Sequence, residues 1–354
     1  MAATRLSRIQ QGQIVVGGSV ASDTVTISTV DPLKSILFYS CRRNDVTGAQ
    51  GTRLVGVLTD STTITFYKDD TSHDITVEWQ LLEFSSGVVV QHGTTTADSS
   101  DINITISSVT LANSFVLCDG YWNDATFTRS VEKVNAALTS PTNLNIERGA
   151  SISGQRAVYQ VVQIDNASVQ TDVKNFTLVT DTVTITSVDT SKTFVFTGAT
   201  DDTGNNVRKI DDWGVSVDLT ASDTLTFRHY NNGRSYNCRW YVVTLSDDGF
   251  AVQRNNHTFS STNAENITLN SLLQNYSVAM TGGMGNHMLR SEAGGGGEAY
   301  PSGTATKKIT SSTNLEVECD GWDSGEASVM DWQVLEFPPA IVKRNQILWF
   351  PGIA

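Results

Sequence analysis

Apolar and polar residues alternate along most of this chain, as they do in strands of a half-buried sheet. Val25 and Ile27 alternate with Thr26 and Ser28, and the turn "DPLKS" then leads into the apolar run Ile36–Tyr39. A period of two residues is typical of β-strands, and no segment has the period of an amphipathic helix. The wealth of Thr, Ser, Asn, Asp and Gly, which favour strands and turns, agrees with this pattern. We therefore predict an all-β protein.

Three phrases recur four times each, always in the same order. The first phrase begins at Val25, Ile104, Val183 and Ile267, and the second begins at Leu58, Leu138, Leu219 and Ile309. The third phrase is "WQLLEF" from Trp79, "YQVVQI" from Tyr159, "WYVVTL" from Trp240 and "WQVLEF" from Trp332. A period of about 80 residues indicates four copies of one structural unit. With a further strand-like stretch at Gly87–Gly93, each copy has about six strands, which predicts a small antiparallel β-sandwich.

The predicted organisation is a short N-terminal element followed by four tandem β-sandwich repeats. The N-terminal arm or strand spans 1–20, and the repeats span 21–96, 97–178, 179–260 and 261–354. The fourth repeat carries a Gly-rich insertion and an apolar C-terminal tail. The N-terminal "RIQQGQIVV" resembles the sixth strand of a repeat, although the other five strands of a repeat do not precede it. We expect it to complete the first repeat or to pair with a neighbouring molecule.

The aromatic residue that opens the third phrase is predicted to lie in the core of each repeat. Its four occurrences are Trp79, Tyr159, Trp240 and Trp332. The same strand is unusual at its end, because Leu82 and Phe84 are apolar on the face opposite that of Trp79. This end of the strand is therefore expected to be covered on both sides.

The copies differ most in the segment between the second and third strands, so recognition is expected there. The candidate partner-contact residues in these segments are Arg42, Arg43, Tyr121, Trp122, Asn123, Trp213, Met284, His287 and Tyr300. The pair Tyr121–Trp122 suits a protein contact, a glycan contact or local packing. The C-terminal residues Ile347, Leu348, Trp349 and Phe350 are too apolar for a solvated tail. They are expected to dock onto the fourth repeat or onto another molecule.

Charge and motifs argue against several classes of function. The net charge of −13 argues against nucleic-acid binding, and no apolar stretch is long enough to insert into a membrane. The N-terminus lacks the apolar core of a secretion signal, so synthesis in the cytoplasm is expected. Cys41, Cys118, Cys238 and Cys319 lack the spacing of a disulfide framework or a metal site. No nucleophile elbow, zinc motif or phosphate loop is present, so we expect neither an enzyme nor a cofactor. A glycosidase needs only two carboxylates that converge in space, and that alternative stays open.

The combination "TVTISTVDPLKS", "LTDSTTITF" and "VEWQLLEFSSGVVVQHG" resembles a β-repeat of structural proteins of tailed bacteriophages, over about residues 20–345. The resemblance implies a virion-surface protein made in the host cytoplasm. It implies a head decoration (cement) protein or, alternatively, a neck or tail component. The partners would be capsid, neck or tail subunits and further copies of the chain, as a trimer or hexamer.

The strand order and the Trp-bearing fifth strand are also similar to H-type lectin domains. That similarity implies a second alternative, a module that binds a host-surface glycan or receptor during adsorption. The sugar-binding residues of those lectins have no residue-by-residue match in this chain. Four sugar sites made by duplication should also share an aromatic or carboxylate pattern, and the four differing segments do not.

Overall fold

The computed structural model describes residues 3–43, 54–68, 71, 73–97, 101–122, 134–148, 155–201, 215–229, 236–260, 264–281, 289–290, 305–319 and 328–340. Within these ranges the chain forms strands, turns and four single-turn 3-10 helices, and it contains no α-helix. None of the helices in the described ranges has the length and apolarity needed to cross a membrane. The all-β prediction is confirmed.

The strands fall into four consecutive groups, which we call units 1 to 4. Unit 1 contains β1 (Arg5–Val16), β2 (Ser22–Thr26), η1 (Pro32–Lys34), β3 (Ser35–Arg43), β4 (Leu54–Asp60), β5 (Thr63–Lys68) and β6 (Ile75–Ser86). Unit 2 contains β7 (Val88–Ala97), β8 (Asp101–Thr105), η2 (Leu111–Asn113), β9 (Ser114–Trp122), β10 (Val134–Ser140), β11 (Asn143–Arg148) and β12 (Gln155–Ile164).

Units 3 and 4 repeat this order. Unit 3 contains β13 (Ala167–Phe176), β14 (Thr180–Thr184), η3 (Thr190–Lys192), β15 (Thr193–Asp201), β16 (Val215–Ala221), β17 (Thr224–His229) and β18 (Tyr236–Leu245). Unit 4 contains β19 (Ala251–Phe259), β20 (Glu265–Thr268), η5 (Gln274–Tyr276), β21 (Ser277–Thr281), β22 (Leu289–Arg290), β23 (Ala305–Ser311), β24 (Asn314–Cys319) and β25 (Ser328–Glu336).

Each unit contains two antiparallel sheets, which have three strands each except for one four-stranded sheet in unit 4. The inner sheets have the orders β1-β6-β3, β7-β12-β9, β13-β18-β15 and β19-β25-β21, and β22 also pairs with β25. The outer sheets have the orders β2-β5-β4, β8-β11-β10, β14-β17-β16 and β20-β24-β23. The same pairing scheme therefore recurs along the chain, as the sequence repeat predicted.

The strand from Val88 corrects one sequence-based expectation. We expected it to be the last strand of the first repeat, but β7 pairs with β12 and belongs to unit 2. The reason is that β6 has only two edges, and β1 and β3 occupy both. The N-terminal strand thus supplies unit 1 with the strand that β7, β13 and β19 supply to the later units. Units 2, 3 and 4 consequently begin about ten residues before the starts predicted for the second, third and fourth repeats.

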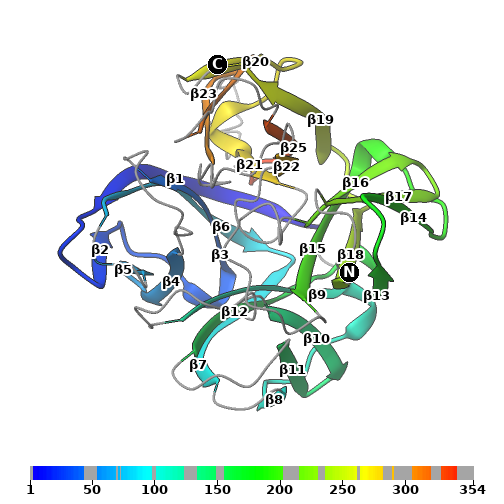
Figure 1. Ribbon diagram of the computed structural model, residues 1–354, viewed down its shortest axis with the longest axis horizontal. Coiled ribbons are helices and arrows are strands. Elements are labelled where there is room, and N and C mark those ends of the chain that lie inside the picture. Colours follow the sequence, from blue (N-terminus) through cyan, green and yellow to red (C-terminus); the bar gives the residue numbers. More distant parts are fainter. Residues whose placement is uncertain are drawn as a thin grey trace, which may run out of the picture.

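The four units are arranged as a closed ring around a common centre (Figure 1). Strand β4 of unit 1 contacts β9 and β12, β10 of unit 2 contacts β15 and β18, and β16 of unit 3 contacts β25. Strand β23 of unit 4 then contacts β3 and β6 of unit 1, which closes the ring. We call this last contact the closing interface, because no connecting segment links its two sides.

One apolar cluster fills the centre of the ring and includes residues from all four units. Leu82 and Phe84 of unit 1 belong to this cluster, at 0% and 1% exposure. The second apolar face predicted for this strand therefore covers the central core. Phe84 lies against Phe337, with ring centroids 5.2 Å apart, and Phe337 lies against Phe250 at 5.1 Å.

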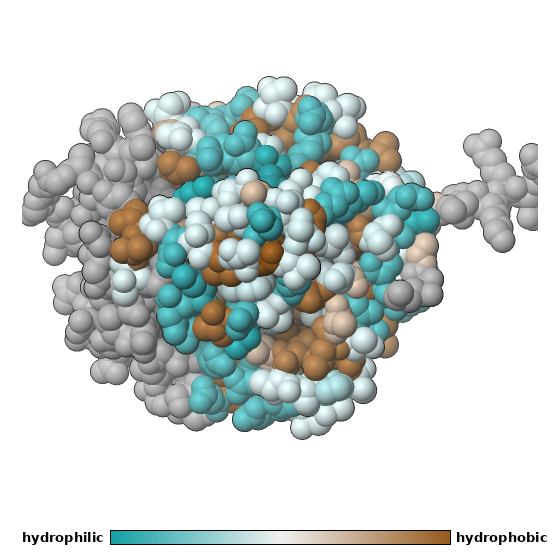
Figure 2. Space-filling model, turned by 90° about the vertical axis from the view of Figure 1, so that its right-hand side faces the viewer, coloured by the Kyte–Doolittle hydropathy of each residue, from teal (hydrophilic) through white to brown (hydrophobic). Residues whose placement is uncertain are grey.

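Smaller apolar clusters lie between the inner and outer sheets. Those of units 1, 3 and 4 contain Trp79, Trp240 and Trp332, all of which are buried. Unit 2 has no separate cluster in the described ranges, because the apolar residues between its two sheets belong to the central cluster. Tyr159 of unit 2 is only partly buried and packs against that cluster. The side of the ring that Figure 2 shows carries hydrophilic residues with separate hydrophobic patches between them.

Candidate interaction site

Neighbouring units are joined by glutamine side chains that we call glutamine bridges. Gln160 of unit 2 accepts a hydrogen bond from the Leu37 backbone N–H and donates one to the Leu37 carbonyl, both at 2.8 Å. Leu37 lies on β3, the edge strand of its inner sheet. An edge strand presents backbone groups that no other strand pairs, and burying them unpaired is costly. The glutamine amide satisfies both of these groups at once.

Two further interfaces use the equivalent glutamine. Gln333 of unit 4 accepts a hydrogen bond from the Val195 N–H at 3.0 Å and donates one to the Val195 carbonyl at 2.6 Å. Gln80 accepts from the Ala279 N–H at 3.1 Å and contacts the Ser277 carbonyl at 3.4 Å. Since Gln80 belongs to unit 1 and Ala279 to unit 4, this bridge joins the two ends of the ring.

The interface between units 2 and 3 is built differently. The position of the glutamine is taken by Tyr241, whose hydroxyl donates a hydrogen bond to the Ala136 carbonyl at 2.7 Å. Asn135 donates to the Asn237 carbonyl at 3.0 Å and accepts from the Arg239 N–H at 3.2 Å. Strands β10 and β15 pass so close that a Cβ on Gly198 would lie 2.9 Å from the Val134 carbonyl oxygen. This interface therefore depends on a glycine and on direct contact between backbones.

Replacing Gln333 with glutamate should lower the free energy of unfolding by about 1–3 kcal/mol. The carboxylate cannot donate to the Val195 carbonyl, and Gln333 is only 2% exposed, so the lost bond leaves a buried acceptor. Urea denaturation followed by tryptophan fluorescence measures the change. The matched control is Gln170→Glu, whose glutamine bonds the Thr186 backbone on the surface. Equal losses in the two variants would contradict the importance of the bridge.

The closing interface carries more charge than the glutamine bridge alone. Arg42 pairs with Glu318 at 2.9 Å, and Lys308 lies 3.5 Å from Glu78. Burial raises the pKa of Glu78, and the Lys308 ammonium partly opposes that shift. The Lys307 backbone N–H donates to the Ser40 hydroxyl at 3.0 Å. Ion pairs and a backbone hydrogen bond thus link β23 and β24 to β3 and β6.

The side chain of Lys307 is buried in this interface, and burial lowers its pKa from 10.5 to about 7. Below pH 7 the folded and unfolded states both carry the charge, so the full desolvation cost opposes folding. Between about pH 7 and 10.5 only the unfolded state holds the proton, and stability rises with pH. Above that window the cost disappears.

Lys307→Met should therefore be more stable than the parent protein at pH 6–7, by on the order of a few kcal/mol. The advantage should shrink as the pH rises towards 10.5. Urea denaturation across this pH range tests the expectation. Lys308→Met is the control, because the Lys308 side chain is 46% exposed and its charge remains hydrated. An advantage that does not change with pH would contradict the assigned cause.

The N-terminal segment, residues 3–6, touches the ends of all four units. The Thr4 N–H donates to the Asp247 carboxylate at 3.0 Å, and its hydroxyl donates to the Asn166 side-chain oxygen at 2.5 Å. The Leu6 N–H donates to the Pro338 carbonyl at 3.0 Å. Gly87 has a φ of +77°, and a Cβ there would lie 2.8 Å from the Thr4 Cα. The ends of β6, β12, β18 and β25 therefore meet at this segment.

The strand ends that flank the differing segments lie at the opposite end of the ring. In unit 1, Arg43 at the end of β3 and Val16 at the end of β1 both pair with Ile75, the first residue of β6. Ser86, at the other end of β6, lies beside the N-terminal segment and donates to the Ala3 carbonyl. The same pairing scheme recurs in every unit. We call this end of the ring the loop-bearing face.

Of the predicted contact residues, Arg42 has a described side chain, and its guanidinium is held by Glu318 within the chain. For Arg43, Tyr121 and Trp122 the backbone is described, at the ends of β3 and β9, and their side chains are not. The remaining candidates lie outside the described residues: Asn123, Trp213, Met284, His287, Tyr300, Ile347, Leu348, Trp349 and Phe350.

Sequence reasoning missed the glutamine bridges and the contacts of the N-terminal segment. The signal for the bridges was present, because Gln80, Gln160 and Gln333 follow the core aromatic in three of the four copies. A polar residue repeated inside a buried strand usually has a hydrogen-bond partner. An N-terminal arm or strand was predicted over 1–20, but no signal showed that Thr4 and Leu6 would bond to residues of the other units.

Within the described ranges, no three His, Cys, Asp or Glu side chains are grouped so that they could hold a metal ion. The four cysteines are buried as thiols. The described residues form a closed ring, and the strand ends that flank the four differing segments lie on one face of it. Compared with known proteins, the chain matches no family model and no curated protein.

Proposed function

We propose that this chain is a non-enzymatic structural protein of a tailed-phage particle, in the first place a head decoration (cement) protein. In this proposal each pair of sheets is one sandwich repeat, and the four repeats act together as one rigid body. The observation that carries the proposal is the closure of the ring around a shared core. A closed body of this kind suits a protein that must hold neighbouring subunits at fixed positions.

The arrangement of the strand ends supports a role in fastening. Unlike segments leave a common scaffold on one face, as in other proteins whose loops carry recognition. Within the proposal, the segments that contain Tyr121, Trp122 and Met284 and the apolar C-terminal residues contact capsid, neck or tail subunits. The net charge of −13 suits a cationic partner surface better than a nucleic acid.

Ring closure also bears on how copies of the chain would assemble. The side surfaces through which the units contact one another are used within the chain, including those of the closing interface. A trimer or hexamer would therefore form through the loop-bearing face, the outer sheets or the chain ends. In the proposal the virion surface is the place of assembly.

Copy number and position in the particle test the proposal. We expect hundreds of copies on the shell, counted by quantitative gel densitometry and located by cryo-electron microscopy. Three, six or twelve copies at a vertex or on the tail would instead make it a neck or tail component. Its absence from purified particles would refute a virion role.

A second experiment compares particles with and without the protein. Loss of the protein should weaken the particles towards heat and osmotic shock while adsorption to cells stays unchanged. Lost adsorption with unchanged particle stability would replace the proposal with glycan or receptor binding. Re-addition of the purified protein should restore stability, which separates loss of the protein from damage during preparation.

A further inference from the structure

The interface between units 2 and 3 contains an edge strand that no glutamine bridge covers. Val116 on β9 is the equivalent of Leu37 on β3. Leu37 is next to Phe38, which pairs with Gln80, and Val116 is next to Leu117, which pairs with Gln160. At the other interfaces, Leu37, Val195 and Ala279 each give their N–H to a glutamine. In the described part of the chain, no side chain bonds to the backbone of Val116. Tyr241 reaches Ala136 instead.

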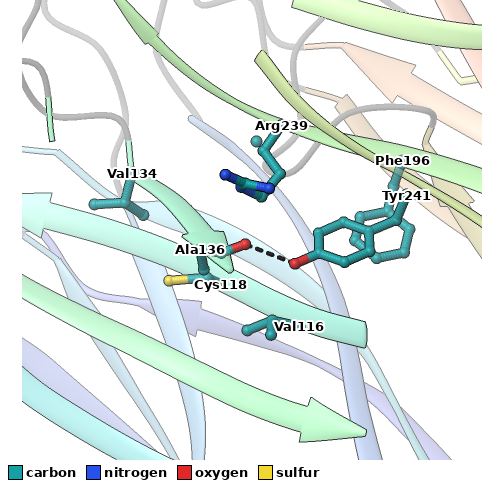
Figure 3. Close-up of a pocket in the computed structure, with 8 residues that line it drawn as sticks. Val116, Cys118, Val134, Ala136, Phe196, Arg239 and Tyr241 are labelled. Atoms are coloured by element: carbon teal, nitrogen blue, oxygen red, sulfur yellow. Dashed lines mark hydrogen bonds between the residues drawn. The ribbon is translucent and has the colours of Figure 1, made fainter. Parts of the chain in front are cut away.

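A small pocket lies at this place (Figure 3). It is lined by Val116, Cys118, Val134, Ala136, Phe196, Gly198, Arg239 and Tyr241, and its volume is about 10 Å³. That volume is close to the minimum needed for one water molecule, and water also needs polar partners. The residues come from β9 and β10 on one side and from β15 and β18 on the other. The pocket thus lies where the missing bridge would have been.

Two polar side chains of β18 in unit 3, Arg239 and Tyr241, line the pocket. The Arg239 guanidinium points into it between Val134 and Tyr241 (Figure 3), and its Nε is buried with no hydrogen-bond partner in the described structure. Glu147 lies 3.6 Å from the Arg239 Nη2 and holds the guanidinium in position. The Tyr241 hydroxyl donates its hydrogen to the Ala136 carbonyl and also hydrogen-bonds the Thr171 side chain.

We propose that this pocket is a water-binding site and that one bound water molecule replaces the missing glutamine amide between units 2 and 3. Water can accept a hydrogen bond from the Val116 N–H or the Arg239 Nε–H and can donate to the Val116 carbonyl. These are the two roles that the amide fills at the other interfaces. The interface between units 2 and 3 is therefore hydrated, whereas the other three are bridged directly.

Water-to-amide magnetisation transfer in the full-length, deuterated protein tests the site by NMR. We expect a cross-peak between water and the Val116 amide proton, and none at the amides of Leu37, Val195 and Ala279. These three are matched controls inside the same molecule, because they occupy equivalent positions with a glutamine bound. No cross-peak at Val116, or equal cross-peaks at all four amides, would overturn the proposal.

Tyr241→Phe separates bound water from exchange through the tyrosine hydroxyl. The variant keeps the stacked contact with Phe196, whose ring centroid lies 5.0 Å away, and removes the exchanging proton. A cross-peak at Val116 that persists in the variant supports a water molecule in the pocket. Its disappearance assigns the signal to the hydroxyl and overturns the site.

Discussion

Replacing Phe337 with alanine should lower the free energy of unfolding of the whole chain by about 3–5 kcal/mol. Phe337 is 2% exposed and lies in the central core against Phe84 of unit 1 and Phe250 of unit 4. Removing the phenyl group leaves a cavity where unit 4 meets unit 1. Because the central cluster contains residues of all four units, their unfolding is expected to remain a single transition.

Two independent probes measure this result. Tryptophan fluorescence reports on the seven tryptophans of the chain, which include the buried Trp79, Trp240 and Trp332 of three units, and circular dichroism reports on all the strands. Leu33→Ala is the control, because Leu33 is 61% exposed and should change stability by less than about 0.5 kcal/mol. Separate transitions, with only unit 4 destabilised, would show that the units fold as independent domains and would contradict a shared core.

Deleting residues 1–6 should destabilise the protein by more than Leu6→Ala alone, which should itself cost about 2–5 kcal/mol. Leu6 is fully buried, and its backbone bonds to Pro338 and Ala340 across the closing interface. The deletion also removes the Thr4 N–H from the Asp247 carboxylate, which is 7% exposed. A buried carboxylate that loses its donor is costly.

The free energy of unfolding of both variants, measured in urea, tests this order. Val15→Ala is the matched control on the same strand, since Val15 is 45% exposed. A deletion variant as stable as the parent protein would contradict the role of the segment. Limited proteolysis adds an independent readout, because weakening the closing interface should expose β1 and β25 to cleavage before the other strands.

Much of the fold followed from local pattern. Alternation at Val25–Ser28 and the recurrence of "WQLLEF" predicted strands, turns and four copies of one unit. The strand around Trp79 was expected to be covered on both faces at its end, and Leu82 and Phe84 do lie in the central core. These features could be predicted because burial on one face of a strand imposes a period of two.

Contacts between different units could not be predicted from the sequence. Arg42 lies within a differing segment and was predicted as a partner contact, and its guanidinium pairs with Glu318 of unit 4 within the chain. Sequence spacing gave no indication that β23 would contact β3 or that Glu318 of β24 would reach Arg42, because these strands are separated by most of the chain. The bridging role of Gln80 was hidden for the same reason.

The sequence by itself determined the β class, the fourfold repeat and the strand end that is buried on both faces. Each of these features is recorded in the order of apolar and polar residues along the chain. Only the tertiary structure decided where a unit begins and that the four units close into a ring. A tandem repeat has no marked starting point, so β7 could close one unit or open the next. The choice is made by a distant contact: β1 occupies the edge of β6, and β7 must pair with β12. Ring closure likewise rests on Gln80, Leu6 and Phe337, whose partners are brought together only by the fold.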